Sequence, residues 1–274
     1  MAGSRKHWFI ILCCSLFFSS LSAQIKNIKT DSWERTQANK KGTIAVLWYA
    51  IEPFIYFNDG KITGIEYELM QGFIPFLQKT YGVDLTINWV DAGAFEPIYP
   101  AIKTSGEKGL FAMSYYSITA ERKAEVKFSP PYMPDLNILV TSNNLPVFND
   151  ESAFIKKMNG YAGYTMARTT MEEDMNKLRT VQPALRVSNR LDDYEVLNQI
   201  AAVNNAFGYV PLSIYVLALQ RGTKVKRQKI LATRREGLAA IYTKSSDWDE
   251  PVNAYFNSED CKKLTTGLIR KPQE

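Results

Sequence analysis

The regular alternation of short apolar strands with amphipathic helices is the feature that most constrains the fold. An apolar run at 43–48 and a helix-spaced run at 65–81 are followed by an alternating segment at 84–90, a short helical segment at 95–104 and an apolar segment at 109–113. Strands separated by helices of this length form βαβ units, whose strands pair in parallel. We therefore expect an α/β fold with mostly parallel sheets flanked by helices.

A second series of the same kind follows the first. It opens with an extended segment at 138–141 and then alternates helices and strands almost to the end of the chain. The expected helices are 151–158, 169–180, 193–203, 211–220, 247–256 and 259–269, and the expected strands are 161–165, 185–188, 206–210 and 238–243. The polar and basic segment 25–42 lies before the first strand, and we expect it to be a loose leader.

The first 23 residues have the layout of a secretory signal peptide. A basic pair, Arg5 and Lys6, precedes an apolar run at 8–18, and a Ser/Ala-rich stretch with a cleavage site near Ala23 follows. The apolar run is shorter than the ~20 residues that a membrane-spanning helix needs. We expect cleavage and a periplasmic location. An uncleaved anchor or a lipidated cysteine are the alternatives.

Histidine and cysteine are scarce after this segment. The one histidine, His7, and two of the three cysteines, Cys13 and Cys14, lie inside it, so only Cys261 remains in the mature chain. This excludes Ser-His-Asp and Cys-His catalysis, histidine-ligated metals, four-cysteine zinc sites and an intramolecular disulfide. We expect no metal and no cofactor. The net charge of +5 is too small to indicate a nucleic-acid partner.

The segment 114–133 carries the clearest chemical signal. It follows a strand, and it places Ser117 and Arg122 where a helix begins. Backbone N–H groups at a helix start, a hydroxyl and a planar guanidinium together suit a carboxylate or phosphate. In an open α/β sheet such a ligand lies beyond the carboxyl ends of the strands. The alternative is that Arg122 pairs with Glu121 or Glu125 and that the hydroxyls only cap the helix.

Three separated stretches resemble one family. They are D-G-K-I-T-G-I-E-Y-E-L at 59–69, F-E-P-I-Y-P-A-I at 95–102 and S-I-T-A-E-R-K-A-E-V-K-F-S-P-P-Y at 117–132. In this order they resemble the bacterial extracellular solute-binding proteins of the polar amino-acid type, family 3. The second half resembles the family more loosely, through Y-A-G-Y-T-M-A-R-T-T-M-E-E at 161–173.

The resemblance implies a type II periplasmic-binding fold. Two α/β lobes would be joined by two crossover strands, near 135–141 and 228–235. Residues 43–136 with 232–274 would form the first lobe, and residues 141–228 the second. Such a protein closes on its ligand by hinge motion. We expect a monomeric, non-enzymatic receptor that delivers a small carboxylate-bearing, amino-acid-like molecule to an ABC importer in the membrane.

The resemblance also implies which residues bind. Arg122 would hold the ligand carboxylate, helped by Ser117 and Thr170, while Phe95 and a residue near Ile51 would stack on its apolar part. Tyr115 and Tyr116 stand where the family often has small residues, and Trp48 stands where the first strand opens into the cleft. The expected set is Trp48, Ile51, Phe95, Tyr115, Ser117, Arg122, Thr169 and Thr170.

Some positions depart from the family pattern. Val210 and Pro211 occupy the region where amino-acid binders place an acid for the α-ammonium, and Arg168 replaces a glycine. An unpaired buried ammonium is costly, so a standard amino acid held in the family manner is in doubt. Asp192 and Asp193 either supply a replacement acid or cap a helix. Arg168 either adds a cation to the cleft or lies in solvent.

Two other functions fit the same fold. One is a ligand-sensing or regulatory module that acts on a partner. The other is a periplasmic enzyme resembling cyclohexadienyl dehydratases, a carboxylate-based lyase with Glu172, Glu173 or Asp174 as the acid. Acids in the first turn of a helix also complement its dipole, which is the structural interpretation of these three residues.

Overall fold

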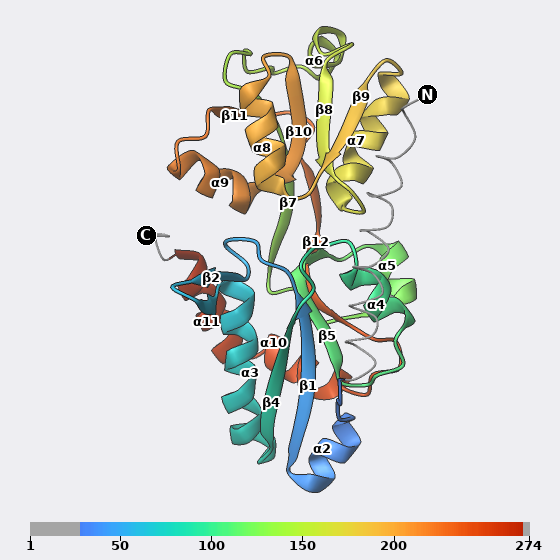
Figure 1. Ribbon diagram of the computed structural model, residues 1–274, viewed down its shortest axis with the longest axis vertical. Coiled ribbons are helices and arrows are strands. Elements are labelled where there is room, and N and C mark those ends of the chain that lie inside the picture. Colours follow the sequence, from blue (N-terminus) through green and yellow to red (C-terminus); the bar gives the residue numbers. More distant parts are fainter. Residues whose placement is uncertain (1–27, 271–274) are drawn as a thin grey trace, which may run out of the picture.

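The computed structural model describes residues 28–270 and contains two lobes joined by two long strands (Figure 1). The expected signal peptide lies outside the described residues. Within 28–270 no helix is long and apolar enough to cross a membrane. The expected ranges of the two lobes remain a prediction, and the hinge strands described below run between them.

One mixed sheet passes through both lobes in the order β4-β1-β5-β12-β7-β10-β8-β9. In the first lobe, β1 pairs in parallel with β4 and β5, and in the second lobe β8 pairs in parallel with β9 and β10. The first-lobe strands are β1 (Lys41–Trp48), β4 (Asp84–Asp91), β5 (Leu110–Ser117), the short β6 (Lys127–Phe128), and the separate hairpin β2 (Tyr56–Asn58) and β3 (Lys61–Thr63). The second-lobe strands are β8 (Ala162–Met166), β9 (Arg186–Arg190), β10 (Ala206–Pro211) and β11 (Val225–Arg227).

The hinge consists of β7 (Met133–Ser142) and β12 (Thr233–Tyr242), which pair with each other antiparallel. Asp135 stands opposite Arg235, and Asn137 opposite Thr233. Both strands are longer than the apolar segments predicted at 138–141 and 238–243. β12 begins with a polar run, and β7 begins with Met133, Pro134 and Asp135, so the first residues of neither strand form an apolar run in the sequence. The crossovers are therefore one pair of strands that runs between the lobes (Figure 1).

The helices cover the sheet as their patterns predict. Helix α3 (Ile65–Tyr81) has the predicted bounds and ends at Gly82, which adopts the left-handed conformation that glycine tolerates. It packs with α10 (Asp249–Phe256) and α11 (Glu259–Arg270), and Cys261 is buried there. The remaining helices are α4 (Ile98–Thr104), α5 (Ala120–Glu125), α6 (Glu151–Lys157), α7 (Thr170–Val181), α8 (Asp193–Ala202) and α9 (Leu212–Gln220).

The loose leader expected over 25–42 is wrong for its last part. Residues Trp33–Asn39 form helix α2, and β1 already begins at Lys41. Trp33 is buried with its ring 5.1 Å from the rings of both Tyr81 and Trp248. A seven-residue helix is too short to show a helical period in the sequence, so this packing could not be read from the pattern.

The aromatic contact of α2 gives a stability prediction. Trp33→Ala should lower the free energy of unfolding by about 3–5 kcal/mol, because it leaves a cavity beside Tyr81 and Trp248. Gln37→Ala, on the exposed side of the same helix, is the matched control and should change it by less than about 0.5 kcal/mol. Chemical denaturation measures both. Equal, small effects of the two substitutions would show that α2 does not contribute to the core.

Candidate ligand-binding site

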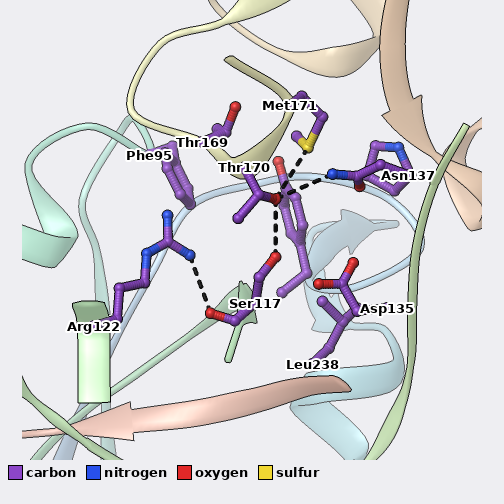
Figure 2. A pocket seen from close by; sticks show the side chains of 11 residues that line it. Phe95, Ser117, Arg122, Asp135, Asn137, Thr169, Thr170, Met171 and Leu238 are labelled. Atoms are coloured by element: carbon purple, nitrogen blue, oxygen red, sulfur yellow. Dashed lines mark hydrogen bonds between the residues drawn. The ribbon is translucent and has the colours of Figure 1, made fainter. Parts of the chain in front are cut away.

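A small cavity lies where the two lobes meet, and we call it the inner cavity (Figure 2). Its volume is about 10 Å³, which is room for about one water molecule. The lobes are therefore closed on each other, and protein side chains fill the space between them. The lining residues are Phe95, Tyr115, Ser117, Arg122, Asp135, Asn137, Thr169, Thr170, Met171, Pro211 and Leu238.

Six of the eight residues expected from the sequence line this cavity: Phe95, Tyr115, Ser117, Arg122, Thr169 and Thr170. The other two do not. Trp48 ends β1 inside the first lobe, with its ring 5.3 Å from that of Phe57. Ile51 forms a β-bridge with Ile55, and this compact turn buries its side chain in the lobe core.

Arg122 connects the two lobes without pairing with an acid. Its Nη1 donates to the carbonyl of Ser117 at 3.2 Å, and its Nη2 donates to the carbonyl of Arg168 in the second lobe at 3.2 Å. Of the two acids that could have paired with it, Glu125 instead accepts from Lys103. In the part of the chain that the structure describes, Arg122 makes no ion pair. The guanidinium charge at the cavity is therefore not neutralised by a carboxylate.

Hydroxyl groups from both lobes meet beside this guanidinium. The Ser117 hydroxyl lies 3.0 Å from the Thr170 hydroxyl, at the first turn of α7 (Figure 2). Thr169 is the N-cap of α7 and accepts from the backbone N–H of Glu172. The start of α7 therefore faces the inner cavity with its positive dipole end.

The hinge strands hold the start of α7 in place. Asn137 on β7 donates to the Thr170 hydroxyl at 3.1 Å and to Asp174 at 3.2 Å. On β12, Arg235 donates to Asp174 at 2.9 Å and to the Thr170 carbonyl at 3.1 Å. Asp174 is thus a buried acid with a full set of structural partners, which include the Thr233 hydroxyl. Its side chain is not free to act as a catalytic acid in this arrangement.

Tyr115 fills the space where the lobes face each other. Its φ of 42° lies in the left-handed region, which is strained for an aromatic residue. The buried carboxylate of Glu66 stabilises this backbone by accepting from its N–H at 2.7 Å. The Tyr115 hydroxyl lies 2.6 Å from the Tyr49 hydroxyl and donates to Asp193 of the second lobe at 3.0 Å. Tyr115 is therefore a direct contact between the closed lobes.

The two neighbouring acids at the start of α8 have different environments. Asp192 is the N-cap and accepts from the backbone N–H of Glu195. Asp193 is fully buried against the tyrosines, and its Oδ1 has no hydrogen-bond partner in the described chain. Burial raises the pKa of Asp193 from 3.8 to about 7, although the Tyr115 hydroxyl lowers it and the charge of Asp192 raises it further. One acid is thus a cap, and the other faces the first lobe.

Arg168, at the position of a family glycine, has an exposed side chain. Its φ of 60° explains why a glycine suits this position. Its backbone carbonyl accepts from Arg122, and its backbone N–H donates to Glu172. The structure therefore places its backbone, and not its charge, at the contact between the lobes.

A second, larger cavity lies beside the same hinge strands and opens near α9 and α11; we call it the outer cavity. Its volume is about 470 Å³, and its lining is mainly apolar, with Pro53, Ile65, Leu217 and Ile269 among its residues. Asp135, Pro211 and Leu238 line both cavities. The outer cavity is large enough for a small molecule. The charged and hydroxyl groups that could fix a carboxylate converge on the inner cavity instead.

Sequence reasoning missed Asp135, Asn137, Met171, Pro211 and Leu238 among the lining residues. Asp135 and Asn137 stand two apart on β7, so they share one side of the strand. The segment near 135–141 was expected to be a crossover, and its alternation of polar with apolar residues was the available signal. In residues 28–270 no group of three or more His, Cys, Asp or Glu side chains could hold a metal ion.

Comparisons with known proteins agree on one fold. The family model described as bacterial extracellular solute-binding proteins, family 3, matches residues 44–257. No curated protein matches the chain significantly. Among solved structures, the arginine-, lysine-, histidine-binding protein ArtJ from Geobacillus stearothermophilus is 19% identical with a TM-score of 0.64, covering 84% of this chain and 97% of that chain.

Two further structures are similar to the same extent. The substrate-binding protein of an amino acid ABC transporter is 19% identical with a TM-score of 0.66, covering 84% of this chain and 100% of that one. The ancestral amino acid-binding protein AncCDT-1, a precursor of cyclohexadienyl dehydratase, is 18% identical with a TM-score of 0.62, covering 83% and 96%. At these identities the likeness shows the fold, which is the type II periplasmic-binding fold. With the family model matching most of its length, the chain belongs to the bacterial extracellular solute-binding proteins, family 3.

Proposed function

We propose that this substrate-binding receptor closes its lobes on a small carboxylate-bearing ligand and delivers it to an ABC importer. The observation that carries the proposal is Arg122: a guanidinium at the inner cavity, bonded to carbonyls of both lobes and to no carboxylate in the described chain. A planar guanidinium is matched to a carboxylate by two parallel hydrogen bonds.

The surroundings of Arg122 support the same ligand group. The hydroxyls of Ser117 and Thr170 can donate to carboxylate oxygens, and the start of α7 presents N–H groups and a positive dipole end. The Arg122 side chain lies near the rings of Tyr99 and Tyr116, which fix its orientation by cation–π contact. A carboxylate at this place would neutralise a charge that the closed protein leaves unpaired.

Ligand entry requires the lobes to separate. A cavity of about 10 Å³ cannot hold an amino acid, and direct contacts such as Ser117 to Thr170 and Tyr115 to Asp193 occupy the space. We infer that a ligand enters the open form and that closure around it replaces these contacts. The shared ribbon of β7 and β12 is the hinge for this movement.

The importer and the periplasmic location are parts of the proposal that the family supports. Family 3 proteins are extracellular, and one similar structure is the binding protein of an amino acid ABC transporter. The expected signal peptide at residues 1–23 would direct the chain there. We also expect the protein to be a monomer, as its resemblance to the family implies.

A carboxylate-based lyase is the second candidate, because one similar structure is a precursor of cyclohexadienyl dehydratase. The acids expected for that chemistry have structural partners instead. Glu172 accepts from the backbone N–H of Arg168, Glu173 is near Arg235, and Asp174 is held by Arg235 and Asn137. Binding without catalysis is therefore the function we favour. Loss of a ring hydroxyl or carboxyl from an aromatic acid during incubation would identify the enzyme.

Arg122→Ala should remove most of the ligand-induced stabilisation. A panel of amino acids, dicarboxylates and aromatic acids is tested by thermal unfolding of the mature protein. A ligand at about 100 times its dissociation constant stabilises by ~2.7 kcal/mol, or roughly 5–10 °C at this size. Removing the guanidinium should weaken binding at least about 30-fold. Lys123→Ala, which removes the adjacent exposed cation, is the control. A shift in Arg122→Ala as large as that of wild type would contradict the assignment.

The raised pKa of Asp193 makes the stability of the closed protein depend on pH. Because the folded-state pKa of about 7 exceeds the unfolded value of 3.8, the folded form binds the proton more tightly between these values. Stability from this group is therefore present below about pH 4 and is lost as pH rises towards 7. Asp193→Asn should lack this loss, and its free energy of unfolding should exceed that of wild type at pH 8 by up to about 4 kcal/mol.

Chemical denaturation at pH 4.5, 6 and 8 measures how the free energy of unfolding of wild type and of each variant depends on pH. Asp150→Asn is the matched control, because asparagine also caps helices and Asp150 is the exposed N-cap of α6. Its pH profile should run parallel to that of wild type. If the profile of Asp193→Asn also runs parallel to wild type, Asp193 is not a buried, protonated contact between the lobes.

A further inference from the structure

Tyr115 fills part of the space between the lobes with its own side chain. It lies near the end of β5, and its hydroxyl donates to the Asp193 carboxylate of the second lobe at 3.0 Å. The Tyr49 hydroxyl, from the same lobe as Tyr115, lies 2.6 Å from it, and the two rings of Tyr115 and Phe54 stack with their centroids 4.6 Å apart. Tyr115 is buried by these contacts. It therefore occupies space that a ligand between the lobes would need.

The backbone holds Tyr115 in this orientation against its conformational preference. Its φ of 42° is unfavourable for an aromatic residue, and such a conformation persists only where the surroundings impose it. Here the fully buried carboxylate of Glu66 accepts from the Tyr115 N–H at 2.7 Å and from the Tyr132 hydroxyl at 2.5 Å. Strained residues of this kind are concentrated at functional sites and switches. The strain therefore indicates that the direction of this side chain has a function.

A second contact between the lobes lies outside the inner cavity. Glu52 of the first lobe forms an ion pair with Arg221, which follows α9, and the Glu52 carbonyl accepts from the Tyr194 hydroxyl at 3.1 Å. The ion pair is partly exposed, and exposed ion pairs contribute little to stability. A buried hydrogen bond from a hydroxyl to a carboxylate is stronger. Of the two contacts, that of Tyr115 with Asp193 therefore contributes more to closure.

The closed form that these contacts stabilise has no room for a ligand. The inner cavity has a volume of about 10 Å³, and Tyr115 is one of the residues that line it. Neither contact uses the Arg122 guanidinium to which we assign the ligand carboxylate. Closure by the protein's own side chain and closure around a ligand therefore exclude each other. A ligand that binds only the open form has its apparent affinity lowered by the fraction of protein that is open.

We propose that Tyr115 is a latch, which holds the lobes closed through Asp193 and competes with the ligand for the space between them. This inference concerns the regulation of the proposed ligand site, and it rests on the proposed function for the place of that site. The latch sets the fraction of protein that is open, and therefore the ligand concentration at which the site fills. Its removal should open the ligand-free protein and tighten ligand binding.

Small-angle X-ray scattering of the ligand-free protein tests the latch without any ligand. The mature protein is unfolded and refolded first, which removes any small molecule carried over from expression. The wild-type scattering should fit the closed structure. Tyr115→Phe keeps the ring and removes the hydroxyl, so its radius of gyration should exceed that of wild type. Tyr115→Asn answers the same question if the phenylalanine variant does not fold, because asparagine tolerates a positive φ.

Tyr67→Phe is the matched control for the scattering. It removes a tyrosine hydroxyl from helix α3 of the same lobe, where the ring packs on Trp89 with centroids 4.9 Å apart. Its radius of gyration should equal that of wild type. Circular dichroism shows whether each variant is folded, so that an increase in size through unfolding is distinguished from separation of the lobes.

Calorimetry tests the competition with the ligand. The probes are those amino acids, dicarboxylates and aromatic acids that stabilise wild type or Tyr115→Phe in thermal unfolding. Tyr115→Phe should bind them at least about tenfold more tightly than wild type, as expected when one hydrogen bond to a charged group no longer holds the lobes closed. If Tyr115 only contacted the ligand, the same substitution would weaken binding. A purely structural role would change neither the scattering nor the affinity.

The outcomes distinguish this inference from the proposed function. The inference is overturned if ligand-free wild type is open, if Tyr115→Phe scatters like wild type, or if Tyr115→Phe binds no more tightly than wild type. In these cases the proposed function stands, provided that binding depends on Arg122. If Tyr115→Phe opens and no probe binds either protein, the proposed function falls and the latch is supported. If Tyr115→Phe alone binds a probe, both are supported.

Discussion

Strands β7 and β12 pair with each other along the line where the two halves of the sheet meet, and the candidate site depends on that pairing. From β7 the pairing brings Asp135 and Asn137 into the space between the lobes, and from β12 it brings Arg235. Asn137 and Arg235 then fix the start of α7, where Thr170 meets Ser117 of the first lobe. The same pair of strands thus forms the hinge and lines the inner cavity.

The closed arrangement contains three buried acids, each with one oxygen that has no partner among the described residues: Glu66, Asp135 and Asp193. Burial raises the pKa of Glu66 to about 7, even though the Tyr132 hydroxyl and the Tyr115 N–H lower it. Glu66 supports the strained backbone of Tyr115, and Asp193 accepts from the hydroxyl of the same residue. Closure without ligand therefore buries charge at the hinge and at the contact between the lobes.

The sequence predicts the local elements well where a periodic pattern is long. Helix α3 has the predicted bounds, because its seventeen residues show helical apolar spacing throughout and a glycine follows the last of them. The hinge strands begin earlier than predicted, because polar residues such as Thr233 become extended only through tertiary pairing. Helix α2 is too short for its period to show, and it depends on the contact of Trp33 with Trp248.

The residues of the candidate site were likewise predictable from the sequence only in part. The segment around Ser117 and Arg122 is local in sequence, so its residue types and spacing reveal the anion-binding half. Asp135 comes from a distant strand, and only the folded register brings it beside Ser117. Trp48 and Ile51 were placed in the cleft by resemblance, whereas their chain positions bury them in the first lobe.

A crystal structure of the mature protein with the amino acid that stabilises it most would test the central claim directly. The account predicts a ligand in an enlarged inner cavity, with its carboxylate on the Arg122 guanidinium. A ligand bound in the outer cavity, or one whose carboxylate lies away from Arg122, would contradict it.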